Sequence, residues 1–223
     1  KNPNEMYPYF AVAECGYRPI IIMYEWPTLE IICVLKGGAA KIYANMDFSP
    51  NGELLVSQGG EPDFLITVWT WLEHKILLRS KSYVNEVFRV KFSPYVPGQL
   101  TSCGLAHIKF WKMAHTFTGL KLKGELGRSL RRRCHDAPIV QFYYNDVDGE
   151  LWSVSMDGHI RVWWYEMIDQ ADPPDDDRIV QLDPSYDFYT PGVMLMSVEK
   201  RFVHEPTDTF YFGQVSTYLR IGF

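Results

Sequence analysis

A histidine, a serine and an aspartate in the second half of the chain carry groups that could do acid–base chemistry together. They are His135, Ser153 and Asp157, and Trp163 follows the aspartate by six positions. A hydroxyl, an imidazole and a carboxylate within hydrogen-bond reach can serve as the nucleophile, base and orienting group of a hydrolase. The same groups can instead satisfy one another inside a folded core, with the indole N–H donating to the hydroxyl.

The local sequence favours the structural interpretation. No Gly-x-Ser-x-Gly sequence, which would expose a nucleophile on a sharp turn, surrounds Ser153. Asp157 and Gly158 form a tight turn between two strand-like runs that contain Ser153 and Trp163. We therefore predict a buried chain of hydrogen bonds from the Trp163 indole through Ser153 and His135 to Asp157. This prediction assigns no catalytic residue and no enzymatic activity.

The cysteines and loops give no sign of a metal or cofactor site. No two cysteines form a CxxC pair, so reduced thiols are expected rather than a disulfide framework or zinc site; the four are Cys15, Cys33, Cys103 and Cys134. A glycine-rich phosphate loop and paired metal ligands are also missing from the sequence. We expect no cofactor and no metal.

Charge argues against a nucleic-acid partner. The net charge is −5 and the basic cluster is small, consisting of Arg128 and residues 131–133. We interpret this cluster and the acidic stretch 169–177 as solvated loops, although the acidic stretch could also dock a basic partner. No apolar run approaches the roughly 18 residues that would cross a bilayer, so no membrane segment is expected.

Tryptophans recur along the chain in a way that predicts the elements around these residues. Trp26, Trp69, Trp111 and Trp163 are separated by 43, 42 and 52 positions. Each ends a run rich in β-branched and aromatic residues, and glycine or proline interrupts the pattern every 8–12 residues or so. A period of roughly 40–45 residues with four strands and a terminal tryptophan is typical of a WD-repeat β-propeller blade.

The predicted fold is therefore all-β, an incomplete WD-repeat β-propeller of about four to five blade equivalents. Strands in place of helices are expected throughout, and the predicted blades cover 9–35, 41–80, 87–126, 139–182 and 194–223. In this interpretation Trp26, Trp69 and Trp111 close their blades as Trp163 closes its own. The turns before Trp69 and Trp111 lack Asp-Gly, so those repeats are expected to be degenerate. Because the first and last blades look partial, we expect a longer protein.

Several phrases resemble one ciliary family in particular. They are Met23–Leu29, Leu65–Trp71, Gly104–Leu122, Met156–Trp163 and Glu166–Asp172. Together they are similar to the WD-repeat region of the cilia- and flagella-associated protein forty-four family, whose members are large axonemal proteins. The family has a further blade where this chain has only residues 128–133, so a blade is expected to be missing between 127 and 134.

The resemblance implies a non-enzymatic scaffold in the axoneme of cilia and flagella, within the cytoplasm and its cytoskeleton. Members of the family form a tether and tetherhead that link inner-arm dynein motor domains to the doublet microtubule and support beating. The implied partners are the paralogous protein forty-three, inner-arm dynein heavy chains and doublet-microtubule tubulin. The alternative is a generic WD-repeat adaptor in another ciliary or cytosolic complex, which the repeats alone would also fit.

Overall fold

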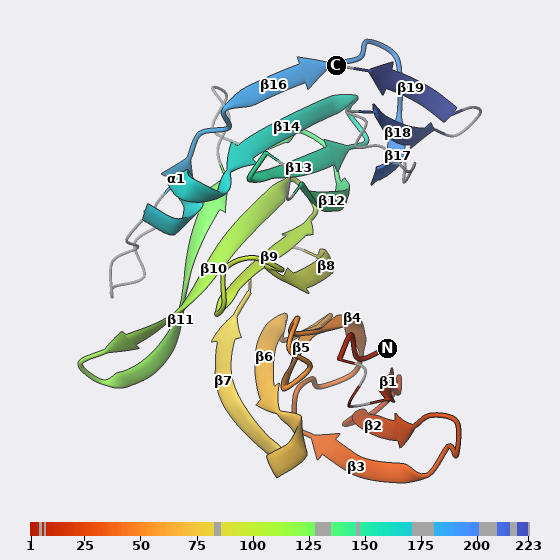
Figure 1. The fold of residues 1–223 in the computed structure, drawn as a ribbon, viewed down its shortest axis with the longest axis vertical. Helices are drawn as coiled ribbons and strands as arrows, with labels where there is room; N and C mark the ends of the chain where they lie inside the picture. Colours follow the sequence, from red (N-terminus) through yellow and green to blue (C-terminus); the bar gives the residue numbers. More distant parts are fainter. Residues whose placement is uncertain are drawn as a thin grey trace. The chain divides into compact units, whose positions relative to one another are not determined.

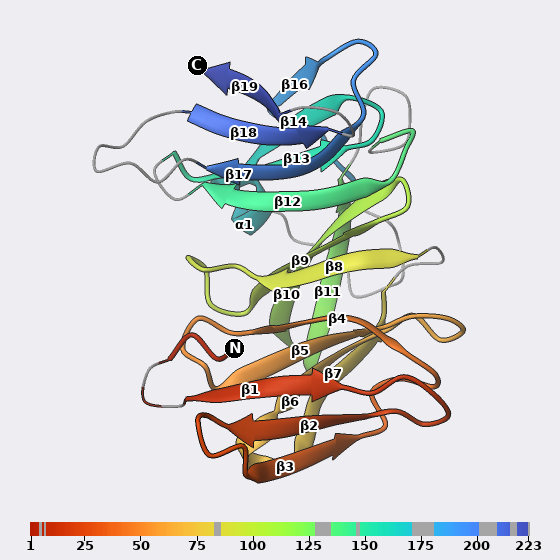
Figure 2. The same cartoon turned by 90° about the vertical axis from the view of Figure 1, so that its right-hand side faces the viewer.

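In the part of the chain that the structure describes, strands dominate and form five sheets. The computed structural model, drawn in Figures 1 and 2, describes residues 1–4, 6, 8–82, 86–127, 135–145, 148–170, 181–200, 209–214 and 218–222. The chain divides into two compact units, one of residues 1–102 and 111–124, and the other of residues 103–110 and 125–223.

Two antiparallel sheets follow each other at the start of the first unit. The first sheet contains, in order, β1 (Tyr9–Ala13), β2 (Ile20–Glu25) and β3 (Ile31–Lys36). The second contains β4 (Tyr43–Phe48), β5 (Leu54–Gly59), β6 (Leu65–Thr70) and β7 (Lys75–Lys81), with the short 3-10 helix η1 (Trp71–Glu73) before β7. The β4–β5 hairpin turns at residues 49–52, where Gly52 takes the left-handed φ of 75° that the chain reversal needs.

The boundary between the two units runs through the third sheet. It contains β8 (Val87–Phe92), β9 (Gln99–Gly104), β10 (His107–Thr116) and β11 (Gly119–Gly127). A fifth strand, β15 (Gln181–Leu182), pairs with β11 in parallel. The predicted blade 139–182 is wrong at its C-terminal end, because the described part of that end, β15, belongs to the sheet of β11.

The second unit contains two more antiparallel sheets. One contains β12 (Ile139–Asn145), β13 (Glu150–Ser155), β14 (His159–Trp164) and β16 (Tyr186–Tyr189), so β16 supplies the fourth strand. The other contains β17 (Leu195–Lys200), β18 (Thr209–Gln214) and β19 (Tyr218–Gly222). The helix α1 (Tyr165–Gln170) directly follows β14. Our expectation of strands throughout did not foresee it.

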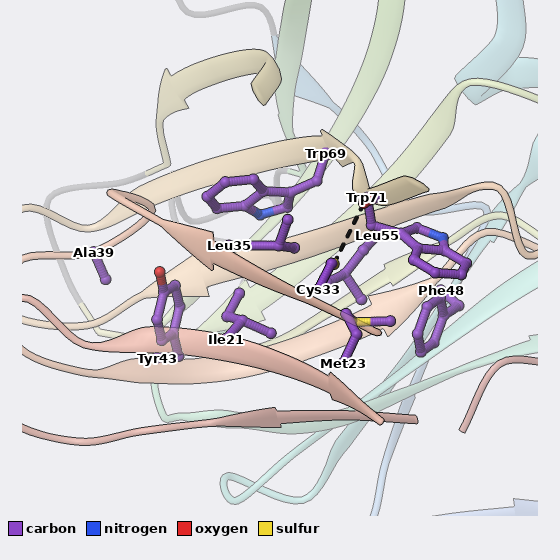
Figure 3. Close-up of a cluster of buried hydrophobic side chains, with 10 residues drawn as sticks. All are labelled: Ile21, Met23, Cys33, Leu35, Ala39, Tyr43, Phe48, Leu55, Trp69 and Trp71. Carbon is purple, nitrogen blue, oxygen red and sulfur yellow. Dashed lines mark hydrogen bonds between the residues drawn. The ribbon is translucent and has the colours of Figure 1, made fainter. Parts of the chain in front are cut away.

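The core lies between successive sheets in each unit. In the first unit, one cluster joins Ile21, Met23 and Leu35 of the first sheet to Leu55 and Trp69 of the second (Figure 3). A second cluster covers the other face of β5 and β6 with residues that include Leu100 and Trp111. In the second unit, Trp163 packs with Phe110, and the opposite face of the same sheet packs against Leu195. Alternation along each strand therefore supplies two apolar faces, one for each neighbouring sheet.

Candidate functional site

His135, Ser153 and Asp157 lie together, as the sequence predicts. The Nε2 atom of His135 lies 3.2 Å from the Ser153 hydroxyl oxygen. The Nδ1 atom of the same ring lies 3.4 Å from Oδ1 of Asp157. We call these three residues the His–Ser–Asp cluster. Its connectivity, from carboxylate to imidazole to hydroxyl, is that of a hydrolase triad.

Three different segments position the cluster. Ser153 lies on β13 and points to the face that also carries Trp163 of β14. His135 precedes β12, and Asp157 lies in the β13–β14 turn. In that turn Gly158 has a φ of 85°, and Oδ1 of Asp157 accepts from the backbone N–H of His159 at 3.1 Å. The second oxygen of Asp157 accepts from the backbone N–H of Asp136 at 3.0 Å, which ties the turn to the segment of His135.

Burial sets the electrostatics of the cluster. Desolvation lowers the pKa of His135 despite the opposing hydrogen bond to Asp157, so the imidazole is neutral at physiological pH. For Asp157, burial acts to raise the pKa, but hydrogen bonds from His135 and backbone N–H groups outweigh it and hold the pKa well below the usual range. A neutral ring protonated at Nδ1 therefore faces an ionised carboxylate and leaves Nε2 to accept from Ser153.

The position of the serine does not suit catalysis. Ser153 has 0% and His135 has 1% of its surface exposed, so a substrate cannot reach the hydroxyl in this conformation. The Ser153 hydroxyl has a single proton, and the carbonyl oxygen of Arg161 on β14, 3.4 Å away, is an alternative acceptor to the imidazole of His135. The arrangement can satisfy buried polar groups and fix the turn, which is a structural use of triad-like chemistry.

The first step of the predicted hydrogen-bond chain is wrong. Trp163 is fully buried, but its indole N–H has no hydrogen-bond partner in the part of the chain that the structure describes. The tryptophan–serine bond is present instead in the two repeats that we expected to be degenerate. Trp69 donates to Ser57 at 2.8 Å and Trp111 donates to Ser102 at 2.9 Å.

Sequence reasoning also missed a second aspartate of this kind. Asp63 precedes Trp69 by six positions, as Asp157 precedes Trp163, and its Oδ2 accepts from the backbone N–H of Ala40 at 3.0 Å. The residue after Asp63 is Phe64, which has a φ of 44° where the other turn has glycine. A search for an aspartate six positions before each tryptophan would have found Asp63. A search for an Asp-Gly pair misses it, because Asp63 is followed by Phe64.

Trp26 is not the equivalent of Trp69. The backbone N–H of Glu25 donates to the carbonyl of Glu30, just as Thr70 pairs with Lys75 at the end of the β6–β7 hairpin. This alignment places Tyr24 at the position of Trp69, and Trp26 at the position of Trp71. Trp26 is 57% exposed, so it does not close its blade from within the described chain.

The remaining candidates carry no site in the described residues. No group of three or more His, Cys, Asp or Glu side chains there could hold a metal ion. Cys15 is exposed, whereas Cys33 and Cys103 are buried and their sulfur atoms lie 3.4 Å from the carbonyl oxygens of Trp71 and Ile139. Cys134, the arginine cluster and residues 171–177 of the acidic stretch lie outside the described part of the chain. No helix in that part is long and apolar enough to cross a membrane.

Comparisons with known proteins point to one family. The chain is 36% identical to cilia- and flagella-associated protein 44 of Mus musculus over 250 residues, covering 92% of the chain and 13% of the mouse protein. It is 40% identical to the protein of the same name from Chlamydomonas reinhardtii over 146 residues, or 65% of the chain and 8% of that protein. The chain thus spans only a small part of these relatives.

A related mouse protein gives a shorter match. Cilia- and flagella-associated protein 43 is 26% identical over 101 residues, covering 45% of the chain and 6% of that protein. No family model matches the chain. The alignment with the mouse protein 44 is longer than the chain itself, so the relative has residues inside the matched region that this chain lacks. A missing blade between 127 and 134 would account for this and stays a prediction.

A solved structure supports the fold. The β-propeller domain of Cps50 (Swd1) from Myceliophteria thermophila aligns with a TM-score of 0.68, covering 95% of this chain and 61% of that chain. The sequence identity is 10%, so the likeness concerns the fold alone. The prediction of an all-β, incomplete WD-repeat propeller is confirmed.

Proposed function

Because the chain belongs to the cilia- and flagella-associated protein 44 family of WD-repeat proteins, we propose that it is a non-catalytic scaffold of the axoneme. In this role it forms part of the tether and tetherhead that link inner-arm dynein motor domains to the doublet microtubule. The single observation that carries the proposal is identity of 36% to the mouse protein over 92% of the chain.

The geometry of the His–Ser–Asp cluster supports the non-catalytic part of the proposal. This cluster has the connectivity of a triad, but it is buried and contacts its own turn and strands. WD-repeat sheets offer many exposed loops on a rigid frame, which suits a protein that holds others in place. The related protein 43 is the first proposed partner, and dynein heavy chains and doublet tubulin complete the proposed set.

Proximity labelling from this chain in motile cilia tests the partners. The full-length polypeptide would carry the labelling enzyme, and the same enzyme on a soluble ciliary-matrix protein would serve as control. We expect protein 43, inner-arm dynein heavy chain and tubulin to be enriched over the control. Enrichment of a different ciliary complex without dynein heavy chain would favour the generic adaptor and reject the tether.

A further inference from the structure

The β10–β11 hairpin is longer than the strands around it. β10 has ten residues and β11 has nine, whereas β5, β6 and β9 have six each. Its distal part, Trp111–Gly124, lies within the first unit, and in Figure 1 it extends beyond β8 and β9. We call Trp111–Gly124 the distal hairpin. Its length places side chains beyond the other strands of the sheet, where a partner can reach them.

One face of the distal hairpin packs on the second sheet. This apolar face joins the cluster that contains Val68 and Leu78, and its members are Trp111, Met113, Leu120 and Leu122. The backbone N–H of Met113 also donates to the carbonyl oxygen of Gly98 at 2.8 Å, which ties β10 to the β8–β9 turn. The hairpin is therefore held in place by its own unit.

The opposite face of the distal hairpin is basic. Lys112, Lys121 and Lys123 alternate with the apolar residues along the two strands, so all three belong to this face. Lys121 is exposed. The distal hairpin contains no aspartate or glutamate, although the whole chain has a net charge of −5. A positive patch of this kind on a negative chain attracts acidic groups.

The neighbouring strand β7 adds to the positive charge. It lies beside the hairpin, because its Leu78 belongs to the cluster on which the hairpin packs. β7 has three exposed basic residues and no acidic one. Lys75 forms an exposed ion pair with Glu73 at 3.4 Å, so Arg79 and Lys81 supply the net charge of this strand.

The tip of the distal hairpin carries an aromatic ring. Phe117 is 105% exposed, although its turn is ordered by a hydrogen bond of 2.8 Å from the Thr116 hydroxyl to the carbonyl oxygen of Gly119. A Cβ atom at Gly119 would meet no atom within 4 Å, so the tip stands in open space. Single exposed rings are common on protein surfaces. An aromatic ring surrounded by charged groups is instead the usual anatomy of a protein interface.

We propose that the distal hairpin docks an acidic segment of another protein, with Phe117 inserted into an apolar part of that partner. Charge complementarity with the lysines speeds association and rejects basic partners. The net negative charge of the chain as a whole repels the same partner elsewhere and disfavours a nucleic acid. This docking does not require the tether role.

Binding of an acidic peptide to the full-length polypeptide tests the chemistry. The probe is a fluorescein-labelled peptide of glutamates around a central leucine, followed by fluorescence anisotropy at low salt. Lys121→Glu should raise the Kd about fivefold, because attraction becomes repulsion. Phe117→Ser should raise it about tenfold, because the apolar anchor is lost. Both positions are exposed, so the melting temperature should not change.

Lys41→Glu is the matched control for charge. Lys41 is exposed in the link between β3 and β4, outside the distal hairpin, and its substitution changes the net charge by the same amount. We expect it to raise the Kd by less than about twofold. Equal weakening by Lys41→Glu, no weakening by Phe117→Ser, or no binding of the peptide to the wild type would each overturn the proposal.

A photo-crosslinker at the position of Thr118, beside Phe117 at the tip, identifies the natural occupant in cilia. The full-length polypeptide would be expressed in light and heavy isotope forms, so that crosslinks to itself are recognised. We expect crosslinks to an aspartate- or glutamate-rich peptide of another protein, and we expect Lys121→Glu to reduce them. Crosslinks to the same chain, to a second copy or to a peptide without an acidic cluster would overturn the proposal. The acidity of the crosslinked peptide tests the docking, whereas the identity of its protein tests the axonemal role, so the two can fail separately.

Discussion

At the scale of single residues, the three closing tryptophans differ in whether the indole N–H is used. Trp69 and Trp111 donate to Ser57 and Ser102, whereas the indole N–H of Trp163 has no partner among the described residues. A buried donor without an acceptor loses its bond to water and gains nothing in exchange. Tryptophan at position 163 therefore contributes through packing, while the other two contribute through packing and a hydrogen bond.

Replacing tryptophan by phenylalanine separates these contributions. Trp69→Phe should cost more than Trp163→Phe by roughly 1 kcal/mol, because it also removes the bond to Ser57 and leaves that hydroxyl buried. Trp111→Phe serves as a second member of the bonded class. The measurement is the opening free energy from hydrogen exchange on the β5–β6, β9–β10 and β13–β14 hairpins in the full-length polypeptide. An equal cost at all three positions would mean that Trp163 has an acceptor after all.

The two turn aspartates allow a second comparison. Asp157→Asn should cost roughly 1–3 kcal/mol, because the carboxylate accepts from two backbone N–H groups and faces the imidazole of His135. Asp63→Asn should cost less, because Asp63 has one bond, from Ala40, and Ala39 occupies the position of His135. The readout is again hydrogen exchange on the β13–β14 and β5–β6 hairpins.

The pH dependence of the Asp157 effect has a definite sign. The folded pKa of Asp157 lies below its ordinary value of 3.8, so the stabilisation is complete above that value and is lost as the pH falls. The difference between wild type and Asp157→Asn should shrink in acid. A difference that grows in acid would contradict the lowered pKa of Asp157.

At the scale of elements, side chains of β4 fasten the neighbouring strand β8 in the first unit. Oδ1 of Asn45 accepts from the backbone N–H of Val90 at 3.0 Å, and Oδ2 of Asp47 accepts from that of Phe92 at 2.9 Å. Both links join residues 45 positions apart, about one repeat. One link uses a neutral amide and the other an ionisable acid, so they respond differently to pH.

Asp47→Asn should therefore strengthen the link between β4 and β8 at neutral pH. Burial raises the pKa of Asp47 from 3.8 to about 6, so between these pH values the unfolded carboxyl ionises while the folded carboxyl keeps its proton, and stability falls until the pH reaches about 6. The loss is on the order of 2–3 kcal/mol above that pH and vanishes below the ordinary value. Asparagine keeps the carbonyl acceptor for Phe92 and does not ionise. Exchange protection of the Phe92 amide, corrected for intrinsic rates, should rise in the variant at pH 7.5 and match wild type at pH 4 or so.

The neighbouring link provides the control for this prediction. Protection of the Val90 amide, which depends on Asn45, should change little between wild type and variant at either pH. If Asp47→Asn instead lowered protection of the Phe92 amide at neutral pH, the prediction would be wrong. The stronger hydrogen bond to an ionised carboxylate would then outweigh the free-energy cost of burying its charge.

The elements themselves differ in how well sequence predicts them. Alternating apolar residues and turn chemistry were enough to place β4–β7, because strand period and turn geometry act locally. The fourth strand of the β12–β14 sheet was misplaced, since which sheet β15 or β16 joins is decided by long-range pairing. The sequence pattern likewise brings His135, Ser153 and Asp157 together, but it does not reveal that the indole N–H of Trp163 has no acceptor among the described residues.

At the scale of the whole molecule, the sheets of WD proteins stabilise one another in series. The β4–β7 and β12–β14 sheets have two apolar faces, and Trp69, Trp111 and Trp163 are each buried against a preceding sheet. The turn after Trp26 has the backbone geometry of the turn after Trp71, but Trp26 is exposed whereas Trp71 is buried. Sequence spacing alone therefore aligned Trp26 wrongly with Trp69. Within each unit, packing between neighbouring sheets is therefore what buries the rings of Trp69, Trp111 and Trp163.

One face of the β1–β3 sheet carries Phe10, Val12, Ile22 and Tyr24, with Trp26 just after β2, and we call it the open face. Residues 1–223 expressed alone should associate through the open face. Val12 and Trp26 are largely exposed there beside partly exposed aromatic rings, and apolar sheet faces of this kind promote aggregation. The double substitution Val12→Thr and Trp26→Ser should raise the monomer fraction in analytical ultracentrifugation and lower light scattering on heating. Phe117→Ser, at the tip of the β10–β11 hairpin and 105% exposed, removes a solvated ring from outside that face and should change neither quantity. A wild-type chain that is a soluble monomer with one cooperative melting transition would show that the open face tolerates water and needs no cover.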